Sequence, residues 1–232
     1  MLLFFILKGY PVNRRQFCTA AAAAALAACA KPPRTQKNRA TVFIIHGYGA
    51  TADDHWFPWL HTQLAQQGIR TVRVPLPDSG QPDFDRWQQT LAQYIGKPSA
   101  NDVFVAHSLG TVSLLHYLTA TQPRHIGGLV LVSAFGKRIP ALPAIGGFNV
   151  DAYIDRCRID FAAVARMTRQ IELFAADNDS IVPADNTRYV ADQLHGHLHI
   201  LAKGGHFLDR DGFTEFPPVL AAVAQMVGRL PA

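Results

Sequence analysis

The feature that most constrains this chain is a serine held between an apolar strand and an apolar helix. Residues 103–105 are Val-Phe-Val, residues 112–118 carry valine and leucine at helical spacing, and the turn between them contains Ala-His-Ser-Leu-Gly. In the pattern Gly-x-Ser-x-Gly, such a tight turn raises the serine hydroxyl above the sheet and leaves backbone N–H groups beside it. Ala106 replaces the first glycine, a mild departure because the position needs only a small side chain. The turn predicts a strand–helix unit of a parallel sheet and makes Ser108 a candidate nucleophile.

Strands and helices alternate through residues 41–230. Apolar β-rich runs predict strands at residues 41–45, 70–74, 102–106, 128–133, 171–175 and 197–201. Helical periodicity predicts helices at residues 56–67, 84–95, 108–120 and 213–229. The alternation predicts one α/β domain, with a sheet of about six parallel strands and helices on both faces. Residues 135–163 interrupt it, being rich in Gly and Pro before turning helical, and fit either a lid over the site or a long connecting loop with a helix.

Two further candidate residues follow the serine in the order Ser, Asp, His. Asp179 comes after the strand expected at 171–175, and His206 lies in Gly-Gly-His-Phe after the strand expected at 197–201. Because ligand sites of open α/β sheets lie at the carboxyl ends of the strands, we expect these side chains to meet there. Histidine would activate the serine, and the carboxylate would orient the imidazole. Asp177 competes for the carboxylate role, but the Asp-x-x-Val-Pro spacing favours Asp179, and Asp177 is expected to shape the turn.

An oxyanion intermediate needs two backbone N–H donors. One is expected from Leu109, directly after the serine, and the other from Tyr48 in the His-Gly-Tyr-Gly loop after the first strand. We expect the substrate pocket to be lined by side chains from the neighbouring loops: His46, Trp56, Trp59, His107, Phe135 and Phe207. The aromatic residues near the first helix fit core positions as well as pocket walls.

Other histidines are interpreted as structural. His195, His197 and His199 alternate and would share one face of a strand, but a zinc site also requires supporting residues and geometry. We therefore expect no metal site, and no cofactor is expected.

The N-terminal 40 residues differ in composition from the rest. Arg14 and Arg15 precede an alanine tract that ends in Leu-Ala-Ala-Cys at Cys29. Residues 1–29 are interpreted as a twin-arginine-like signal peptide whose lipobox ends at Cys29, the residue that would be lipidated. Residues 30–40 would form a flexible tether. An alanine tract that merely ends in cysteine, or an uncleaved membrane anchor, are the alternatives. The apolar block before the arginines fits a signal poorly, so we expect the true start nearer Val12.

The cysteine content agrees with export, and the charge balance gives little support for nucleic-acid binding. Of 22 basic residues three precede Cys29, leaving 19 against 17 acidic residues, and no basic stripe interleaved with aromatics indicates nucleic-acid binding. Cys18 would be lost on cleavage, so Cys157 would remain without a partner for a disulfide. Cys157 lies in a charged stretch without a tight turn, and we interpret it as structural or incidental. We expect the protein to be exported to the periplasm as a membrane-anchored lipoprotein. Without a signal peptide it would stay in the cytoplasm.

Several short motifs together carry a family resemblance. They are His-Gly at 46–47, His-Trp-x-x-Trp-Leu at 55–60, Pro-Leu-Pro-Asp at 75–78, Trp87, the serine turn at 106–110, Leu-Val-Ser-Ala at 131–134, Asp179 with Pro183, and Gly-Gly-His-Phe at 204–207. Over about residues 41–228 the chain resembles the small serine hydrolases similar to retinoblastoma-binding protein 9, which have many bacterial members. The resemblance implies a compact α/β-hydrolase that lacks the first two strands of the superfamily sheet, with a triad of Ser108, Asp179 and His206. It also implies esterase or aminopeptidase-like activity. The export signal departs from this family, many of whose members look cytosolic.

The sequence thus predicts a monomeric serine hydrolase that cleaves small carboxylic esters through an acyl-enzyme. A peptidase or amidase with the same triad, acting on a short peptide-like substrate, is one alternative. A non-catalytic protein-binding module on a hydrolase scaffold is the other. The shape of the pocket, and with it the choice of substrate, depends on residues 135–163.

Overall fold

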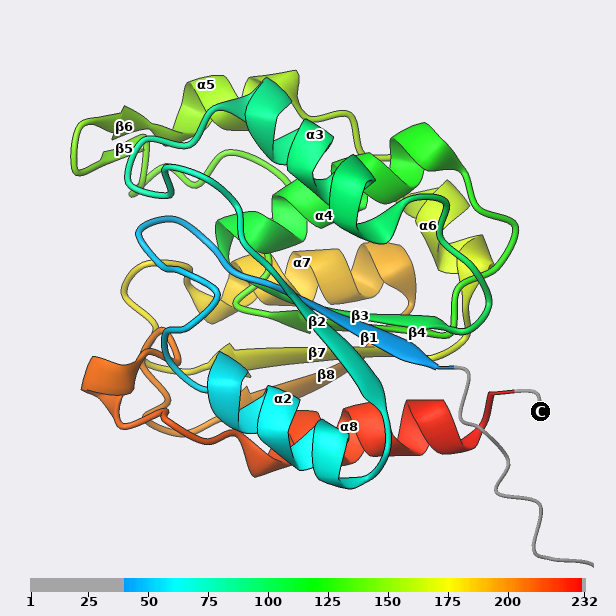
Figure 1. Cartoon of the computed structure of the whole chain (residues 1–232). Helices are drawn as coiled ribbons and strands as arrows, with labels where there is room; N and C mark the ends of the chain where they lie inside the picture. The colour runs from blue at the N-terminus through cyan, green and yellow to red at the C-terminus, as the bar shows by residue number, and fades with distance from the viewer. Residues whose placement is uncertain (1–39, 231–232) are drawn as a thin grey trace, which may run out of the picture. The chain divides into compact units, whose positions relative to one another are not determined.

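The computed structural model describes residues 40–230, so the predicted signal peptide, Cys29 and nearly all of the tether lie outside the described residues. Its centre is a six-stranded parallel sheet in the order β2-β1-β3-β4-β7-β8 (Figure 1). The strands are β1 (Thr41–Ile45), β2 (Arg70–Val74), β3 (Asp102–His107), β4 (Gly128–Val132), β7 (Ile171–Ala176) and β8 (His197–Leu201). The predicted α/β fold with about six parallel strands is confirmed.

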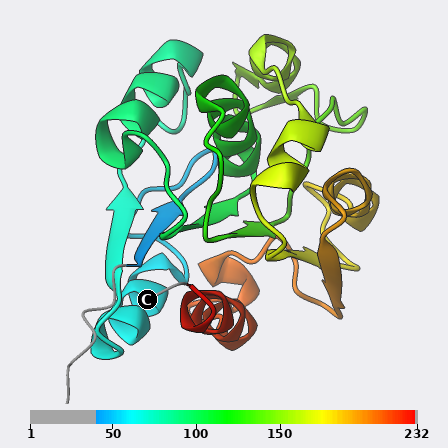
Figure 2. The same cartoon turned by 90° about the vertical axis from the view of Figure 1, so that its right-hand side faces the viewer.

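Helices cover both faces of this sheet, as the two views show (Figures 1 and 2). The helices are α2 (Phe57–Gln66), α3 (Phe84–Ile95), α4 (Leu109–Thr121), α5 (Val150–Arg156), α6 (Phe161–Met167), α7 (Ala184–Leu194) and α8 (Pro217–Gly228). Helices α2 and α8 lie on one face, and α3, α4 and α7 lie on the other. The sheet is therefore the middle layer of three.

Strand side chains alternate between two separate apolar cores. In β1, Phe43 and Ile45 face the α3–α4–α7 layer, whereas Val42 and Ile44 face the α2–α8 layer. Both sets are buried because helices lie on both sides, and so the strand reads as a continuous apolar run. The same alternation continues through β3 and β4, which fixes the register of the central strands.

Apart from ends that differ by one residue, the predicted elements differ from the observed ones in two places. Helix α7 was not predicted, because its sequence is largely polar and only four residues, Thr187, Val190, Ala191 and Leu194, are buried. The predicted final helix begins too early: Phe213 and Phe216 precede it, and α8 starts at Pro217, where a proline fits the first turn.

The segment at 135–163 contains a small hairpin and helical turns. Strands β5 (Ala144–Ile145) and β6 (Phe148–Asn149) pair in an antiparallel hairpin, and α5 and the start of α6 follow. The hairpin lies beside the carboxyl edge of the sheet (Figure 1). It is more structured than a connecting loop and adjoins the site described below.

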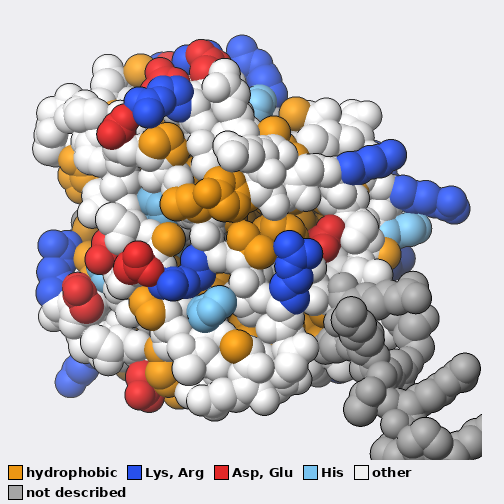
Figure 3. All heavy atoms as spheres, viewed as in Figure 1, with side chains coloured by type: hydrophobic (Ala, Val, Ile, Leu, Met, Phe, Trp, Pro, Cys, Tyr) orange, Lys and Arg blue, Asp and Glu red, His pale blue; other side chains and the backbone are white. Residues whose placement is uncertain are grey.

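Within residues 40–230, no helix has both the length and the apolarity needed to cross a bilayer. On the face shown in Figure 3, acidic and basic side chains are interspersed, with no continuous basic stripe.

Candidate active site

Ser108 occupies a strained turn between β3 and α4. Its backbone has φ 52° and ψ −126°, a conformation that L residues adopt only where the surrounding structure enforces it. The turn is held by the Ser108 N–H, which donates to the Val132 carbonyl at 2.9 Å. Gly110 allows the start of α4 to lie close to the loop after β1, because a Cβ at this position would lie 2.3 Å from the His46 carbonyl oxygen. The loop after β1 is thereby pressed against the start of α4.

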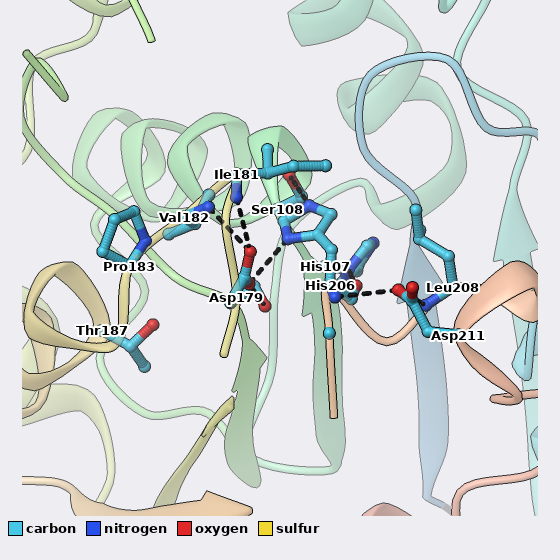
Figure 4. Close-up of polar contacts among 12 residues, drawn as sticks. His107, Ser108, Asp179, Ile181, Val182, Pro183, Thr187, His206, Leu208 and Asp211 are labelled. Carbon is cyan, nitrogen blue, oxygen red and sulfur yellow. Dashed lines mark hydrogen bonds and ion pairs between the residues drawn. The ribbon is translucent and has the colours of Figure 1, made fainter. Parts of the chain in front are cut away.

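Three side chains from separate loops form a hydrogen-bonded line at the carboxyl edge of the sheet (Figure 4). His206 Nε2 lies 2.9 Å from Ser108 Oγ, and His206 Nδ1 lies 2.8 Å from Asp179 Oδ2. Because a carboxylate only accepts, Nδ1 carries the proton and donates to Asp179, which leaves Nε2 free to accept from the Ser108 hydroxyl. All three side chains are buried. This is the arrangement that makes a serine hydroxyl nucleophilic.

The Asp179 carboxylate has partners at both oxygens. Oδ1 accepts from the backbone N–H groups of Ile181 and Val182, both at 2.9 Å, and Oδ2 also accepts from Ser133 Oγ at 2.8 Å. With His206 this makes four hydrogen bonds, which hold the carboxylate in one orientation. Ser133 was not predicted as a site residue. Its position directly after β4, at the same sheet edge as Ser108, was the available signal.

The loops after β7 and β8 are joined by three consecutive side chains. Asp177 Oδ1 accepts from the Lys203 N–H and Asn178 Oδ1 accepts from the Gly205 N–H, each at 2.9 Å, and Asp179 then bonds His206. Asp177 therefore does not contact His206. Asp177 was expected to shape its own turn, and its side chain instead supports the loop after β8 by accepting from the Lys203 N–H.

The backbone of His206 is fixed from two sides. Asp211 Oδ2 accepts from the His206 N–H at 2.9 Å, and His107 Nε2 donates to the His206 carbonyl at 2.9 Å. Burial, reinforced by the neighbouring His206, holds the pKa of His107 well below its usual value. His107 is thus a neutral donor beneath the site. Asp211 was not predicted, and nothing in its sequence spacing distinguishes it.

A cavity of about 320 Å³ opens onto Ser108 and His206. Of the predicted pocket residues, His107 and Phe135 line it, as does Tyr48. Most of one wall comes from the segment after β4, through Leu142, Ile145, Phe148 and Val150. The polar part of the lining includes His55, Asp209 and Arg210. The cavity therefore has an apolar side and a polar side.

Four predicted pocket residues do not line this cavity. Trp56 and Phe207 are fully buried in the α2–α8 core, where both rings pack against Phe216. Trp59 packs against the same core from a partly buried position. His46 is buried and joins two loops, because Nε2 accepts from the Leu76 N–H at 3.1 Å and Nδ1 donates to the Gly47 carbonyl.

The prediction failed for these residues because sequence proximity to the loops did not reveal side-chain direction. His55 is the residue of the His-Trp-x-x-Trp motif that reaches the cavity. Its burial lowers its pKa, although Asp209 opposes the shift.

The two predicted backbone donors lie in adjoining segments. Leu109 is the first residue of α4, and the first N–H groups of a helix have no acceptor within it. Gly47 packs directly on this turn, since a Cβ at Gly47 would lie 2.9 Å from Ser108 Cβ and 3.2 Å from the Leu109 nitrogen. Tyr48 follows it, and its ring stacks on Phe148 of the hairpin.

Cys157 is far from being an activated nucleophile. Burial raises the pKa of its thiol to about 12, and Sγ donates to the Tyr153 carbonyl at 3.5 Å. A thiol with so high a pKa is not ionised at neutral pH, which agrees with the structural interpretation.

The chain is similar to known hydrolases in sequence and in fold. A family model described as serine hydrolase matches residues 42–225. The chain is 35% identical over 179 residues to YdeN of Bacillus subtilis (strain 168), described as a hydrolase, with 77% of this chain and 91% of YdeN covered. The YdeN crystal structure matches with a TM-score of 0.75 and 32% identity, and the match covers 82% of this chain and 100% of YdeN. Est1E from Butyrivibrio proteoclasticus shares the fold at a TM-score of 0.60 and 15% identity, over 85% and 92% of the two chains.

Proposed function

The chain belongs to the serine hydrolase family, and we propose that it cleaves small carboxylic esters with Ser108 as nucleophile, His206 as general base and acid, and Asp179 as the group that orients His206. The observation that carries this proposal is the hydrogen-bonded line from Ser108 through His206 to Asp179 at the floor of an open cavity. Within the family, we propose kinship with the enzymes similar to retinoblastoma-binding protein 9.

The proposed reaction proceeds through an acyl-enzyme. Ser108 Oγ attacks the ester carbonyl carbon while its proton passes to His206 Nε2, and the imidazolium is stabilised by Asp179. The oxyanion of the tetrahedral intermediate accepts from the Leu109 and Tyr48 N–H groups. The C–O bond to the alcohol then breaks, and the alcohol leaves with the proton from His206. Water deprotonated by His206 attacks the acyl-enzyme, and the carboxylic acid is released as Ser108 recovers its proton.

The cavity supports a small acyl group as substrate. Its volume of about 320 Å³ lies at the lower end of typical ligand pockets, about 300–1,000 Å³. The side chains of Leu142, Ile145 and Phe148 would contact the acyl chain, because they form the apolar wall beside Ser108. No cofactor takes part in the proposed steps, and we propose that the enzyme acts as a monomer.

The direct test is labelling by a fluorophosphonate probe, which reacts with activated serines. We expect the wild-type protein to be labelled and Ser108→Ala not to be. Ser113→Ala is the matched control, because Ser113 is buried in α4 and bonds to Tyr153 rather than lining the cavity. Labelling that persists in Ser108→Ala would reject the nucleophile, and an unlabelled but folded wild type would favour a non-catalytic binding module.

The leaving group is tested separately. We expect hydrolysis of p-nitrophenyl acetate to be much faster than hydrolysis of aminoacyl-anilides under the same conditions. A preference for the anilides in a Ser108-dependent reaction would replace the esterase proposal with a peptidase or amidase.

For location, we propose export and lipidation at Cys29, the first residue of the mature lipoprotein. Expressed in a bacterium with lipoprotein-processing enzymes, the wild-type chain should lose its N-terminal residues and fractionate with membranes. Cys29→Ser should abolish both, whereas Cys18→Ser should not. Mass spectrometry of an unprocessed, unmodified N-terminus in the wild type would contradict this proposal.

A further inference from the structure

A second group of chemically active side chains lies on the β7–β8 pair. In the parallel register Glu172 is opposite His197, and Phe174 is opposite His199. Residues two apart on a strand point to the same face, so Glu172, His197 and His199 share the face that carries α8. Among residues 40–230, these three form the group of His, Cys, Asp and Glu side chains that brings three ligand atoms within 4.8 Å of one another. The expectation of no metal site rested on the alternating histidines alone, and Glu172, which comes from another strand, completes a group of three ligands.

The contacts within the group are close and specific. Glu172 Oε2 lies 3.0 Å from His197 Nδ1 and 2.7 Å from His199 Nε2. The His199 ring stacks on Phe174 with centroids 4.7 Å apart and an interplanar angle of 13°, which fixes the direction of its Nε2. One carboxylate oxygen and two imidazole nitrogens thus lie within 4.8 Å of one another on two paired parallel strands.

Space for a further ligand exists beside this point. A cavity of about 470 Å³ is bounded by Glu172, His197 and His199 on the sheet and by Pro218, Ala221 and Gln225 on α8. It shares no lining residue with the cavity at Ser108. The side chains of Glu172 and His199 are 24% and 36% exposed, so a solvated ion can reach them without opening the core.

We propose that Glu172, His197 and His199 bind a divalent transition-metal ion of the Zn²⁺ class, with water in the open position. Two imidazoles and one carboxylate with an open fourth position form a donor set that Zn²⁺ accepts. Tetrahedral zinc with bonds of about 2.0–2.1 Å places its ligand atoms about 3.3 Å apart. The observed separations of 2.7 and 3.0 Å reach that spacing through small side-chain rotations. Mg²⁺ is disfavoured because it prefers oxygen ligands in an octahedron.

The consequence of binding is a cross-link at the edge of the sheet. Strand β8 is an edge strand with β7 as its single partner in the sheet, and the metal joins Glu172 of β7 to two residues of β8. These two strands lead into the loops that carry Asp179 and His206. The ion would hold together the two strands from which those loops depart, without touching the cavity at Ser108.

The test uses the full chain, free of any polyhistidine tag and stripped of metal with EDTA, which is then removed. Calorimetric titration with Zn²⁺ should give saturable binding to one site, and Mg²⁺ should give none. At about 100 times the dissociation constant, Zn²⁺ should raise the melting temperature by about 5–10 °C. Losing a residue that only supports a metal ligand weakens metal binding by about 10–100-fold. Losing a ligand itself should weaken Zn²⁺ binding by more than this, and we expect such a loss in each of three variants: His197→Ala, His199→Ala and Glu172→Gln.

His195→Asn is the matched control. His195 is two residues before His197 but ends α7 with φ 52°, outside the group, and asparagine tolerates that conformation. It should bind Zn²⁺ like the wild type. Absence of saturable binding, or equal affinity in the three ligand variants and the wild type, would overturn the metal site. Fluorophosphonate labelling of each variant reports separately whether the fold and the proposed nucleophile are intact.

Discussion

The two segments that reach the cavity from β7 and β4 are held in different ways. After β7, the loop is tied to the loop after β8 because Asp177, Asn178 and Asp179 accept hydrogen bonds from residues 203, 205 and 206. After β4, residues 135–163 present apolar side chains to the cavity, and polar contacts such as that of Arg138 with Asp155 lie at the exposed surface. The first segment fixes the direction of a carboxylate, and the second shapes a wall. Under the proposed mechanism, reactivity therefore depends on the first segment and acyl selectivity on the second.

The largest effect should come from the polar segment. Asp179→Asn should lower kcat for p-nitrophenyl acetate by about 10⁴-fold, the loss seen when a triad carboxylate becomes an amide and favours the wrong imidazole tautomer. Asp177→Asn is the control, because asparagine keeps an oxygen that accepts from the Lys203 N–H. Similar losses in the two variants would mean that Asp179 has no special role.

A smaller effect should follow from Ser133→Ala. The variant removes one of four hydrogen bonds to the Asp179 carboxylate, and a hydrogen bond to a charged group contributes about 1.5–3 kcal/mol. We expect kcat to fall by about tenfold, with KM little changed, because only part of that energy differs between the ground and transition states. Ser113→Ala should have wild-type kinetics. A change in KM alone would instead indicate that Ser133 shapes the pocket.

The apolar wall should affect selectivity more than turnover. Ile145→Ala should lower kcat/KM for p-nitrophenyl hexanoate by about tenfold relative to the acetate, since pocket contacts with each methylene contribute about 1–3 kcal/mol. Ile200→Ala makes the same change at an exposed position of β8 and should leave the ratio unaltered. Equal losses on both esters would place Ile145 among the residues that set reactivity.

The smallest effect concerns His107, whose ring bonds to the backbone of His206. His107 stays neutral when folded because burial lowers its pKa, whereas in the unfolded chain its value is 6.5. Below pH 6.5 the unfolded state therefore takes up the proton, and stability should fall as the pH is lowered, by at most about 1.4 kcal/mol per pH unit from this residue.

Above pH 6.5 this contribution to the pH dependence is absent. The free energy of unfolding, measured with urea between pH 7 and 5, should change less steeply with pH for His107→Gln than for the wild type. His125→Gln, at an exposed position, should not alter this pH dependence. A wild-type slope in His107→Gln would show that other groups cause the pH dependence.

Elements with a clear local sequence pattern could be predicted, and elements without one could not. Strand β1 (Thr41–Ile45) was predicted to the residue and the other strands of the sheet to within one residue; in β1, burial on both faces leaves an uninterrupted apolar run. Helix α7 was missed because few of its residues are buried. The positions of Ser108, Asp179 and His206 were predictable because each follows a strand at one sheet edge, and the structure brings the three together.

The supporting residues were less accessible to sequence reasoning. Ser133 and Asp211 act through contacts across loops, which no local pattern encodes. Trp56 and Phe207 were misplaced because an aromatic side chain beside a site can point into the core, and side-chain direction depends on tertiary packing. Glu172 had no signal beside the histidines in sequence, since only the β7–β8 register brings it opposite His197.

The three consecutive bonds from residues 177–179 to residues 203, 205 and 206 also limit how the chain length can vary during evolution. One residue inserted or deleted within either run would move the donors at residues 203, 205 and 206 away from their acceptors at residues 177–179. Residues 135–163 have no such matched spacing to another loop, so insertions there change the cavity wall while the register of the reacting groups is kept. Homologues with different substrates should therefore differ in length after β4 and agree in length after β7 and β8.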